Sequence, residues 1–113
     1  MRQAEYVPRR GDIVWMTLNP QAGHEQSGRR PAVVLSPEAY NSKVGLALFC
    51  PLTSRIKGYP WEVSVAEGLP VSGVVLSDQV RSLDWRVRRV EKIGALPPAA
   101  VAEILGKFGT LLL

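Results

Sequence analysis

Cysteine and histidine are nearly absent from this chain, with one of each in 113 residues. Cys50 lies in an apolar run, and a single cysteine cannot form an internal disulfide, so the composition fits a reducing compartment. One cysteine and one histidine also cannot build a zinc site without carboxylates. We therefore expect no metal site and no cofactor.

Long apolar segments are absent as well. No run approaches the roughly 18 residues that a membrane-spanning helix requires, and Met1–Arg10 lacks the apolar core of a signal peptide. We therefore expect a cytoplasmic protein with no membrane partner. The chain has no repeat, low-complexity tract or linker, and its length fits a single domain over residues 1–113. A hydrophobic content of 46% argues against disorder.

Acidic residues are fewer than basic ones, 10 against 14, which gives a net charge of +4. This charge is compatible with a polyanionic partner. Five cations gather late in the chain around only two acidic residues. They are Arg81, Arg86, Arg88, Arg89 and Lys92. The cluster is either a solvated face or a phosphate-binding surface.

Short apolar segments separated by glycine and proline predict a mainly β protein. The expected strands are Ile13–Leu18, Ala32–Ser36, Leu46–Cys50, Trp61–Val65, Val71–Ser77 and Arg86–Ile93, with one helical turn in Pro37–Lys43. Towards the C-terminus the period becomes helical, because Val101, Ile104, Leu105, Phe108 and Leu112 fall on one face. We expect this terminal helix to dock on a small, curved antiparallel sheet or barrel.

The polar segment Gly23–Pro31 lies between the first two expected strands. It gathers an imidazole, a carboxylate, an amide, a hydroxyl and two guanidinium groups, from His24, Glu25, Gln26, Ser27, Arg29 and Arg30. A simple connection does not need these groups, whereas proton transfer and phosphate binding do. The alternative is a solvated polar loop.

Three polar groups lie next to the ends of expected strands. Arg30 precedes the strand at Ala32, Thr53 and Ser54 follow the strand that ends near Pro51, and Asp78 with Gln79 follows Val71–Ser77. In a barrel such strand ends can converge on one mouth. The alternatives are ordinary turn roles, such as a hydroxyl cap at Thr53 or an Asx-turn at Asp78.

Further substrate contacts are predicted in the segment Lys57–Trp61, which joins a cation to two aromatic rings. A nucleobase could stack on Tyr59 or Trp61, although both rings could equally belong to the core.

Ten segments, in this order and spacing, resemble the MazF/PemK family of toxin endoribonucleases. They are Arg10–Trp15, Asn19–Pro20, Gly23–Gln26, Arg30–Pro37, Tyr40–Asn41, Pro51–Ser54, Lys57–Pro60, Gly73, Leu76–Gln79 and Arg81–Trp85. The resemblance runs from about Tyr6 to the C-terminus.

The resemblance implies a small SH3-like antiparallel β-barrel of the CcdB/PemK kind with a terminal helix, assembled as a homodimer. It implies sequence-specific, metal-independent cleavage of single-stranded RNA that leaves 2′,3′-cyclic phosphate and 5′-hydroxyl ends. It also implies a partner, an antitoxin whose acidic C-terminal segment covers the RNA groove, so that the protein is the toxin of a toxin–antitoxin pair and inhibits translation.

The family's functional arginine and threonine fall on Arg30 and Thr53, and its loop carboxylate or histidine falls on Glu25 and His24. The aspartate of some branches falls on Asp78. Those branches carry an arginine two residues earlier, where this chain has Leu76.

The catalytic roles follow from cleavage without a metal, in which the 2′-hydroxyl of RNA attacks the adjacent phosphate. We expect Arg30 to stabilise the phosphorane and Thr53 to hydrogen-bond a non-bridging oxygen. Glu25 is the first choice of base, and His24 is the second choice or the acid. The expected substrate-binding residues are Gln26, Ser54, Lys57, Trp61, Asp78, Gln79 and Arg81.

Two rival functions share the same fold. One is a non-catalytic toxin that binds a topoisomerase, and the other is a nucleic-acid-binding SH3-like module without turnover.

Overall fold

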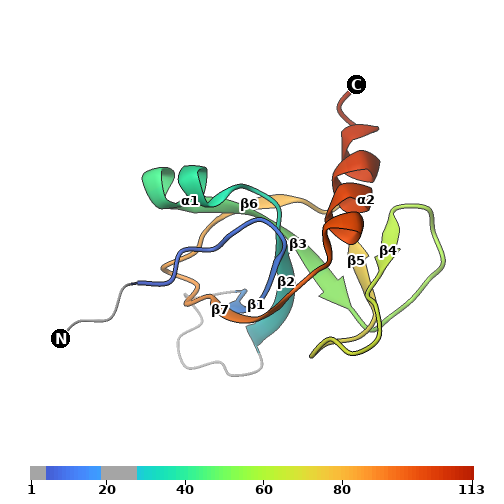
Figure 1. Cartoon of the computed structure of the whole chain (residues 1–113), viewed down its shortest axis with the longest axis horizontal. Coiled ribbons are helices and arrows are strands. Elements are labelled where there is room, and N and C mark those ends of the chain that lie inside the picture. Colours follow the sequence, from blue (N-terminus) through green and yellow to red (C-terminus); the bar gives the residue numbers. More distant parts are fainter. Residues whose placement is uncertain (1–4, 19–27) are drawn as a thin grey trace.

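The computed structural model describes residues 5–18 and 28–113. The elements in chain order are β1 (Asp12–Thr17), β2 (Arg29–Val34), α1 (Glu38–Val44), β3 (Leu46–Thr53), β4 (Glu62–Ser64), β5 (Val74–Leu76), β6 (Arg81–Asp84), β7 (Glu91–Ala95) and α2 (Pro98–Gly109). The prediction of a mainly β fold with a C-terminal helix is confirmed (Figure 1).

The described strands form one sheet in the order β4-β5-β3-β2-β1-β7, and every pairing is antiparallel. Strand β3 is the centre of this sheet. One edge of β3 pairs with β2, while the other edge pairs first with β6 and then with β5. The sheet curves around its own interior (Figure 1). As a result, residues near the C-terminal end of β3 face side chains from several strands.

Side chains alternate across the strands, so the sheet has two buried faces. One face packs under α2, with its buried core formed by Ile13, Val33, Leu35, Cys50, Leu52, Val63, Val75, Leu96 and Ile104. The opposite face carries a second core, formed by Val14, Met16, Ala32, Val34, Ala47, Phe49, Leu83 and Trp85. The candidate site described below lies on this second face.

The terminal helix docks on the sheet, as predicted. Ile104 is fully buried, the Trp61 indole N–H donates to the Lys107 carbonyl (2.9 Å), and the Lys107 ammonium donates to the Glu62 carbonyl (2.8 Å). The expectation that Leu112 shares the packed face is wrong, because α2 ends at Gly109 and Leu112 is 67% exposed.

One expected strand is wrong in its position. In place of Arg86–Ile93, the chain forms β6 before this segment and β7 at its end. Between them it turns, because the Asp84 carboxylate accepts the backbone N–H groups of Arg86 and Val87 (both 3.0 Å), and Arg89 has φ of 53°. The alternation of arginines with Val87 therefore belongs to a turn.

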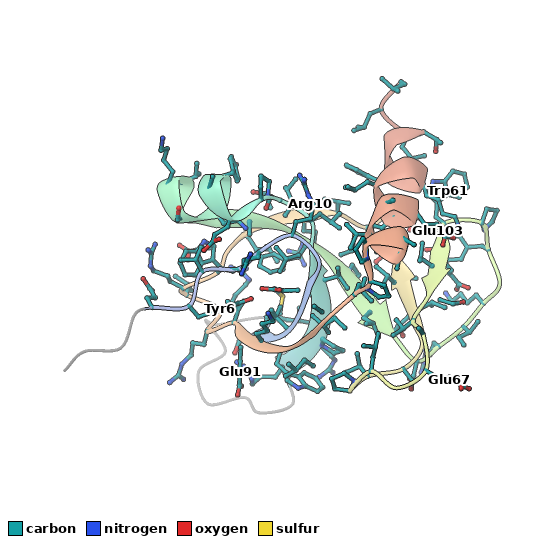
Figure 2. All side chains as sticks on the ribbon, in the orientation of Figure 1. Tyr6, Arg10, Trp61, Glu67, Glu91 and Glu103 are labelled. Carbon is teal, nitrogen blue, oxygen red and sulfur yellow. The ribbon has the colours of Figure 1, made fainter. Side chains whose placement is uncertain are left out.

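The N-terminal segment is fastened to β1 through Tyr6, which Figure 2 shows beside the sheet. The Tyr6 hydroxyl donates to the buried Asp12 carboxylate, which also accepts the Arg9 backbone N–H (3.1 Å). The Lys92 ammonium lies 3.4 Å from the same carboxylate. Burial, followed by the hydrogen bond to Asp12, raises the pKa of Tyr6 above its ordinary value.

Candidate functional site

A cavity of about 340 Å³ opens on the second face of the sheet. Its apolar lining comes from four strands and from Leu18, which follows β1, and consists of Met16, Leu18, Pro31, Ala32, Phe49, Pro51, Leu52 and Leu83. Four polar residues complete the lining: Arg30, Thr53, Gln79 and Arg81. The cavity therefore combines an apolar floor with a hydroxyl, an amide and two guanidinium groups.

Strand register explains why Arg30 and Thr53 meet at this cavity. Ala32 of β2 pairs with Pro51 of β3. Arg30 lies two residues before Ala32 in β2, and Thr53 lies two residues after Pro51 in β3, so period-two alternation places both on the face of Ala32 and Pro51, where both line the cavity. Both residues belong to strands, whereas the sequence had predicted Arg30 just before its strand and Thr53 just after its own.

The same alternation brings Arg81 to this face, because Arg81 pairs with Phe49 in the β3–β6 ladder and both line the cavity.

The two adjacent arginines have different environments. The Arg29 guanidinium donates to Thr17 Oγ1 (2.9 Å) and to the Arg89 carbonyl (3.1 Å), and it lies 3.5 Å from the Glu91 carboxylate. The Arg30 side chain lines the cavity and donates to the Arg29 carbonyl (2.8 Å). Period-two alternation thus separates the two like charges, and Arg29 has protein partners that explain its presence without a phosphate.

The Thr53 hydroxyl has a defined orientation. Its oxygen accepts the backbone N–H of Arg55 (3.1 Å). A hydroxyl that accepts through one lone pair keeps its own proton available as a donor. Thr53 can therefore both cap the start of the following loop and donate into the cavity.

The turn between β5 and β6 contributes Gln79 to the cavity and carries Asp78 next to it. Ser77, which is fully buried, donates both its backbone N–H (3.1 Å) and its hydroxyl to the Trp61 carbonyl. Asp78 is exposed and accepts a hydrogen bond from the Tyr59 hydroxyl (2.7 Å). This hydrogen bond is the main cause that raises the pKa of Tyr59 above its ordinary value.

The other predicted site residues lie at different places. Ser54 and Lys57 are exposed in the loop after β3 and are absent from the described cavity lining. Trp61 lies beside α2 (Figure 2), where its indole N–H is engaged by the helix. His24, Glu25 and Gln26 lie outside the described residues.

Electrostatically, the described lining is cationic, because it contains two arginines and no carboxylate. Within residues 5–18 and 28–113, no three His, Cys, Asp or Glu side chains gather closely enough to hold a metal ion. Neither of the described helices has the length and the apolar run needed to cross a bilayer.

Residues 9–112 match the family described as PemK-like, MazF-like toxin of type II toxin-antitoxin system. The chain belongs to this toxin family. Similarity to the endoribonuclease toxin MazF of Escherichia coli (strain K12) extends over 109 residues at 46% identity, covering 96% of this chain and 97% of that protein. Endoribonuclease PemK of Escherichia coli is 34% identical over 108 residues, covering 91% of this chain and 80% of the relative.

Solved structures of the MazF/PemK family share this fold. A crystal structure of MazE-MazF from Deinococcus radiodurans superimposes with a TM-score of 0.86 at 52% identity, covering 96% of this chain and 97% of that one. A crystal structure of MazF alone from the same organism gives a TM-score of 0.86 at 58% identity. The resemblance read from the sequence is therefore confirmed.

Sequence reasoning missed the contacts that two residues make at this site. Tyr59 was considered as a stacking surface or a core residue, yet its hydroxyl binds Asp78. Gly73 lies against the backbone of Thr53. The period-two pattern of β3 and β6 could have placed Phe49 and Leu83 in the cavity floor, but no sequence signal links Gly73 to Thr53.

Proposed function

We propose that this endoribonuclease toxin cleaves single-stranded RNA at a short sequence, without a metal, by attack of the 2′-hydroxyl on the adjacent phosphate. The products are a 2′,3′-cyclic phosphate and a 5′-hydroxyl. The observation that carries the proposal is the shared cavity of Arg30 and Thr53, with Arg81 at its side.

The proposed roles follow from the charge that develops during the reaction. The pentacoordinate phosphorane carries more negative charge than the phosphodiester, and Arg30 offers a fixed, permanently charged donor for it. Thr53 donates its hydroxyl proton to a non-bridging oxygen, because accepting the Arg55 N–H through one lone pair leaves that proton available. Arg81 binds a neighbouring phosphate.

Proton transfer needs groups other than arginine, which remains protonated at accessible pH. Glu25 is the proposed base that removes the proton of the 2′-hydroxyl. His24 is the second choice of base, or the acid that protonates the leaving 5′-oxygen. Asp78 is a further candidate base, and Gln26, Ser54, Lys57, Trp61 and Gln79 remain proposed RNA contacts.

The donor set favours a reaction without a metal. A divalent cation prefers carboxylate and carbonyl oxygen ligands, whereas the described lining brings two guanidinium groups to the cavity. These groups repel a cation and can neutralise phosphate charge themselves.

Two protein partners complete the proposal. MazE-MazF crystal structures of relatives support an antitoxin as partner, and we propose that an acidic segment of the antitoxin occupies the cationic cavity in place of RNA. We also propose a homodimer in which loops of both subunits build the RNA-binding surface.

The test is to incubate the purified protein with a 5′-labelled RNA of mixed sequence, with and without EDTA, and to map the ends of the products. We expect cleavage at a short sequence, cyclic phosphate ends and no effect of EDTA. Strong inhibition by EDTA would instead indicate a metal enzyme. Intact RNA with a gel shift would indicate a binding module, and intact RNA without a shift would favour the non-catalytic toxin.

A further inference from the structure

Tyr59 links two loops at the edge of the cavity. It belongs to the loop that follows Thr53, and its hydroxyl reaches the β5–β6 turn, where it donates to Asp78 Oδ1 (2.7 Å). Gln79, the next residue along this turn, lines the cavity. The Tyr59 hydroxyl therefore binds an exposed carboxylate whose neighbour in the sequence is an amide that lines the cavity.

The Tyr59 loop is itself well anchored. The Glu62 carboxylate accepts the backbone N–H groups of Lys57 (2.8 Å) and Gly58 (2.9 Å), and the Glu62 N–H donates to the Tyr59 carbonyl (3.1 Å). Gly58 has φ of 84°, in the region that favours glycine. The backbone of Tyr59 is therefore held on a closed loop, and its hydroxyl is held in turn by the hydrogen bond to Asp78.

Contacts other than the one between Tyr59 and Asp78 hold the β5–β6 turn in place. The buried Ser77 already ties the β5–β6 turn to the Trp61 carbonyl through two hydrogen bonds, and β4 pairs with β5 over three residues. A further hydrogen bond at the exposed surface adds little stability. The hydrogen bond between Tyr59 and Asp78 lies beside Gln79 of the cavity lining, so its role concerns the cavity rather than stability.

We propose that Tyr59 is a positioning residue for RNA recognition: its hydroxyl orients Asp78 and Gln79 so that this pair reads a nucleobase next to the scissile phosphate. A carboxylate accepts hydrogen bonds from the amino and imino groups of bases, and an amide both donates and accepts. Because unpaired bases expose these edges, single-stranded RNA is the matching ligand. The inference rests on the proposed function.

The experiment compares Tyr59→Phe with the wild type on RNA that contains the mapped cleavage site. The change keeps the ring and removes only the hydroxyl. We expect KM to rise about 5- to 20-fold, the effect of losing a hydrogen-bonded contact, while kcat stays within about twofold. The Kd for the same RNA with a 2′-deoxy residue at the scissile position should rise in parallel. Selectivity at one position of the cleavage site should also relax.

A double-mutant cycle with Asp78→Ala tests whether Tyr59 acts through Asp78. In that background, Tyr59→Phe should have little further effect on KM. The matched control is Tyr40→Phe, which removes a hydroxyl from α1 beside a different cavity, lined in part by Leu105 and Phe108. The control should leave KM unchanged.

Two kinds of failure can be told apart. If the wild type cleaves no RNA, the proposed function fails and this inference fails with it. If the wild type cleaves, the inference alone is overturned by an unchanged KM and selectivity in Tyr59→Phe, by a fall in kcat at constant KM, or by an undiminished effect in the Asp78→Ala background.

Discussion

Gly73 lies directly against the carbonyl group of Thr53. A Cβ atom on Gly73 would be 2.1 Å from the Thr53 carbonyl oxygen and 2.8 Å from the carbonyl carbon. Gly73 also has φ of 121°, which L side chains rarely adopt. Val74, the first residue of β5, pairs with Thr53 in the β3–β5 ladder. Only glycine therefore lets the chain enter β5 so close to Thr53, whose hydroxyl faces the cavity.

Replacement of Gly73 by alanine should therefore displace Thr53. We expect Gly73→Ala to lower the free energy of unfolding by about 2–4 kcal/mol, from strain and overpacking together, and to reduce RNA cleavage by more than the folded fraction explains. Urea unfolding and single-turnover cleavage measure the two effects.

Gly68→Ala is the matched control for this change. Gly68 also has a positive φ, of 90°, but a Cβ there would meet nothing within 4 Å. This variant carries the backbone strain without the clash, so it should cost about 1 kcal/mol and leave cleavage unchanged. Equal losses of stability and activity in the two variants would contradict the proposed contact with Thr53.

The pair Arg29 and Arg30 offers a test within two adjacent residues. Arg30→Ala should reduce kcat by about 10²-fold or more, as loss of a donor to developing charge does, with an almost unchanged thermal midpoint. Arg29→Ala removes the contacts with Thr17, the Arg89 carbonyl and Glu91. It should therefore cost about 1–2 kcal/mol of stability and much less activity. A reversed pattern would show that the catalytic cation has been misassigned.

The sequence predicted the pieces of this site but not how they fit together. Apolar runs and helical spacing identified most strands and α2, because hydrophobic periodicity is local. The approach of Arg30 to Thr53 depends on the β2–β3 register, which joins residues 23 positions apart in the sequence. Such pairing is set by the whole sheet.

The prediction failed where local patterns compete with specific hydrogen bonds. Alternating arginines suggested a strand across the β6–β7 connection. The Asp84 carboxylate instead accepts hydrogen bonds from two backbone N–H groups and stabilises a turn there. For Trp61 the sequence left a stacking surface and a core position open, and residue type did not reveal that its indole N–H docks α2. In both cases the deciding partner lies on another element or on the backbone, so residue type alone could not reveal it.

The Thr53 hydroxyl can be removed with little change in shape. We expect Thr53→Val to lower kcat by about 10- to 10²-fold, since a neutral donor contributes less than a charged one, while the strand is maintained by the β-branched side chain. Thr53→Ser restores the hydroxyl and should recover most of the activity. Single-turnover cleavage gives these rates, and failure of serine to rescue would point to a steric role for the side chain.

Stability should fall in alkali, and Cys50 should be a main cause. Burial, together with the charge of Asp78, raises the pKa of the Cys50 thiol from 9.0 to about 12. Above pH 9 the unfolded chain therefore loses a proton that the folded chain keeps. The stabilisation that the protonated Cys50 thiol contributes is fully present below pH 9. It is lost as the pH rises towards 12, and the free energy of unfolding falls by up to about 1.4 kcal/mol per pH unit.

The measurement is urea unfolding at pH 8, 9 and 10 for the wild type and Cys50→Ala. The variant loses some packing at every pH, but its stability should decline less between pH 8 and 10. Tyr6 acts in the same direction above pH 10, because burial and the hydrogen bond to Asp12 raise its pKa as well. Parallel pH curves for the wild type and Cys50→Ala would contradict the assignment to the thiol.

Salt dependence decides between the cavity and the basic turn as the place where RNA phosphates bind. Arg81 lines the cavity, whereas the Arg86 guanidinium pairs with Glu5 (2.9 Å) and lies 4.3 Å from the centre of the Trp85 ring. Each lost phosphate contact lowers the slope of log K against log salt by about 0.7 for a single strand. The measurement is fluorescence anisotropy of a labelled 2′-deoxy-substituted RNA at salt concentrations between about 50 and 300 mM, where counterion release dominates the salt dependence. The slope should fall for Arg81→Ala and stay unchanged for Arg86→Ala. The opposite result would move the RNA backbone from the cavity to the β6–β7 turn.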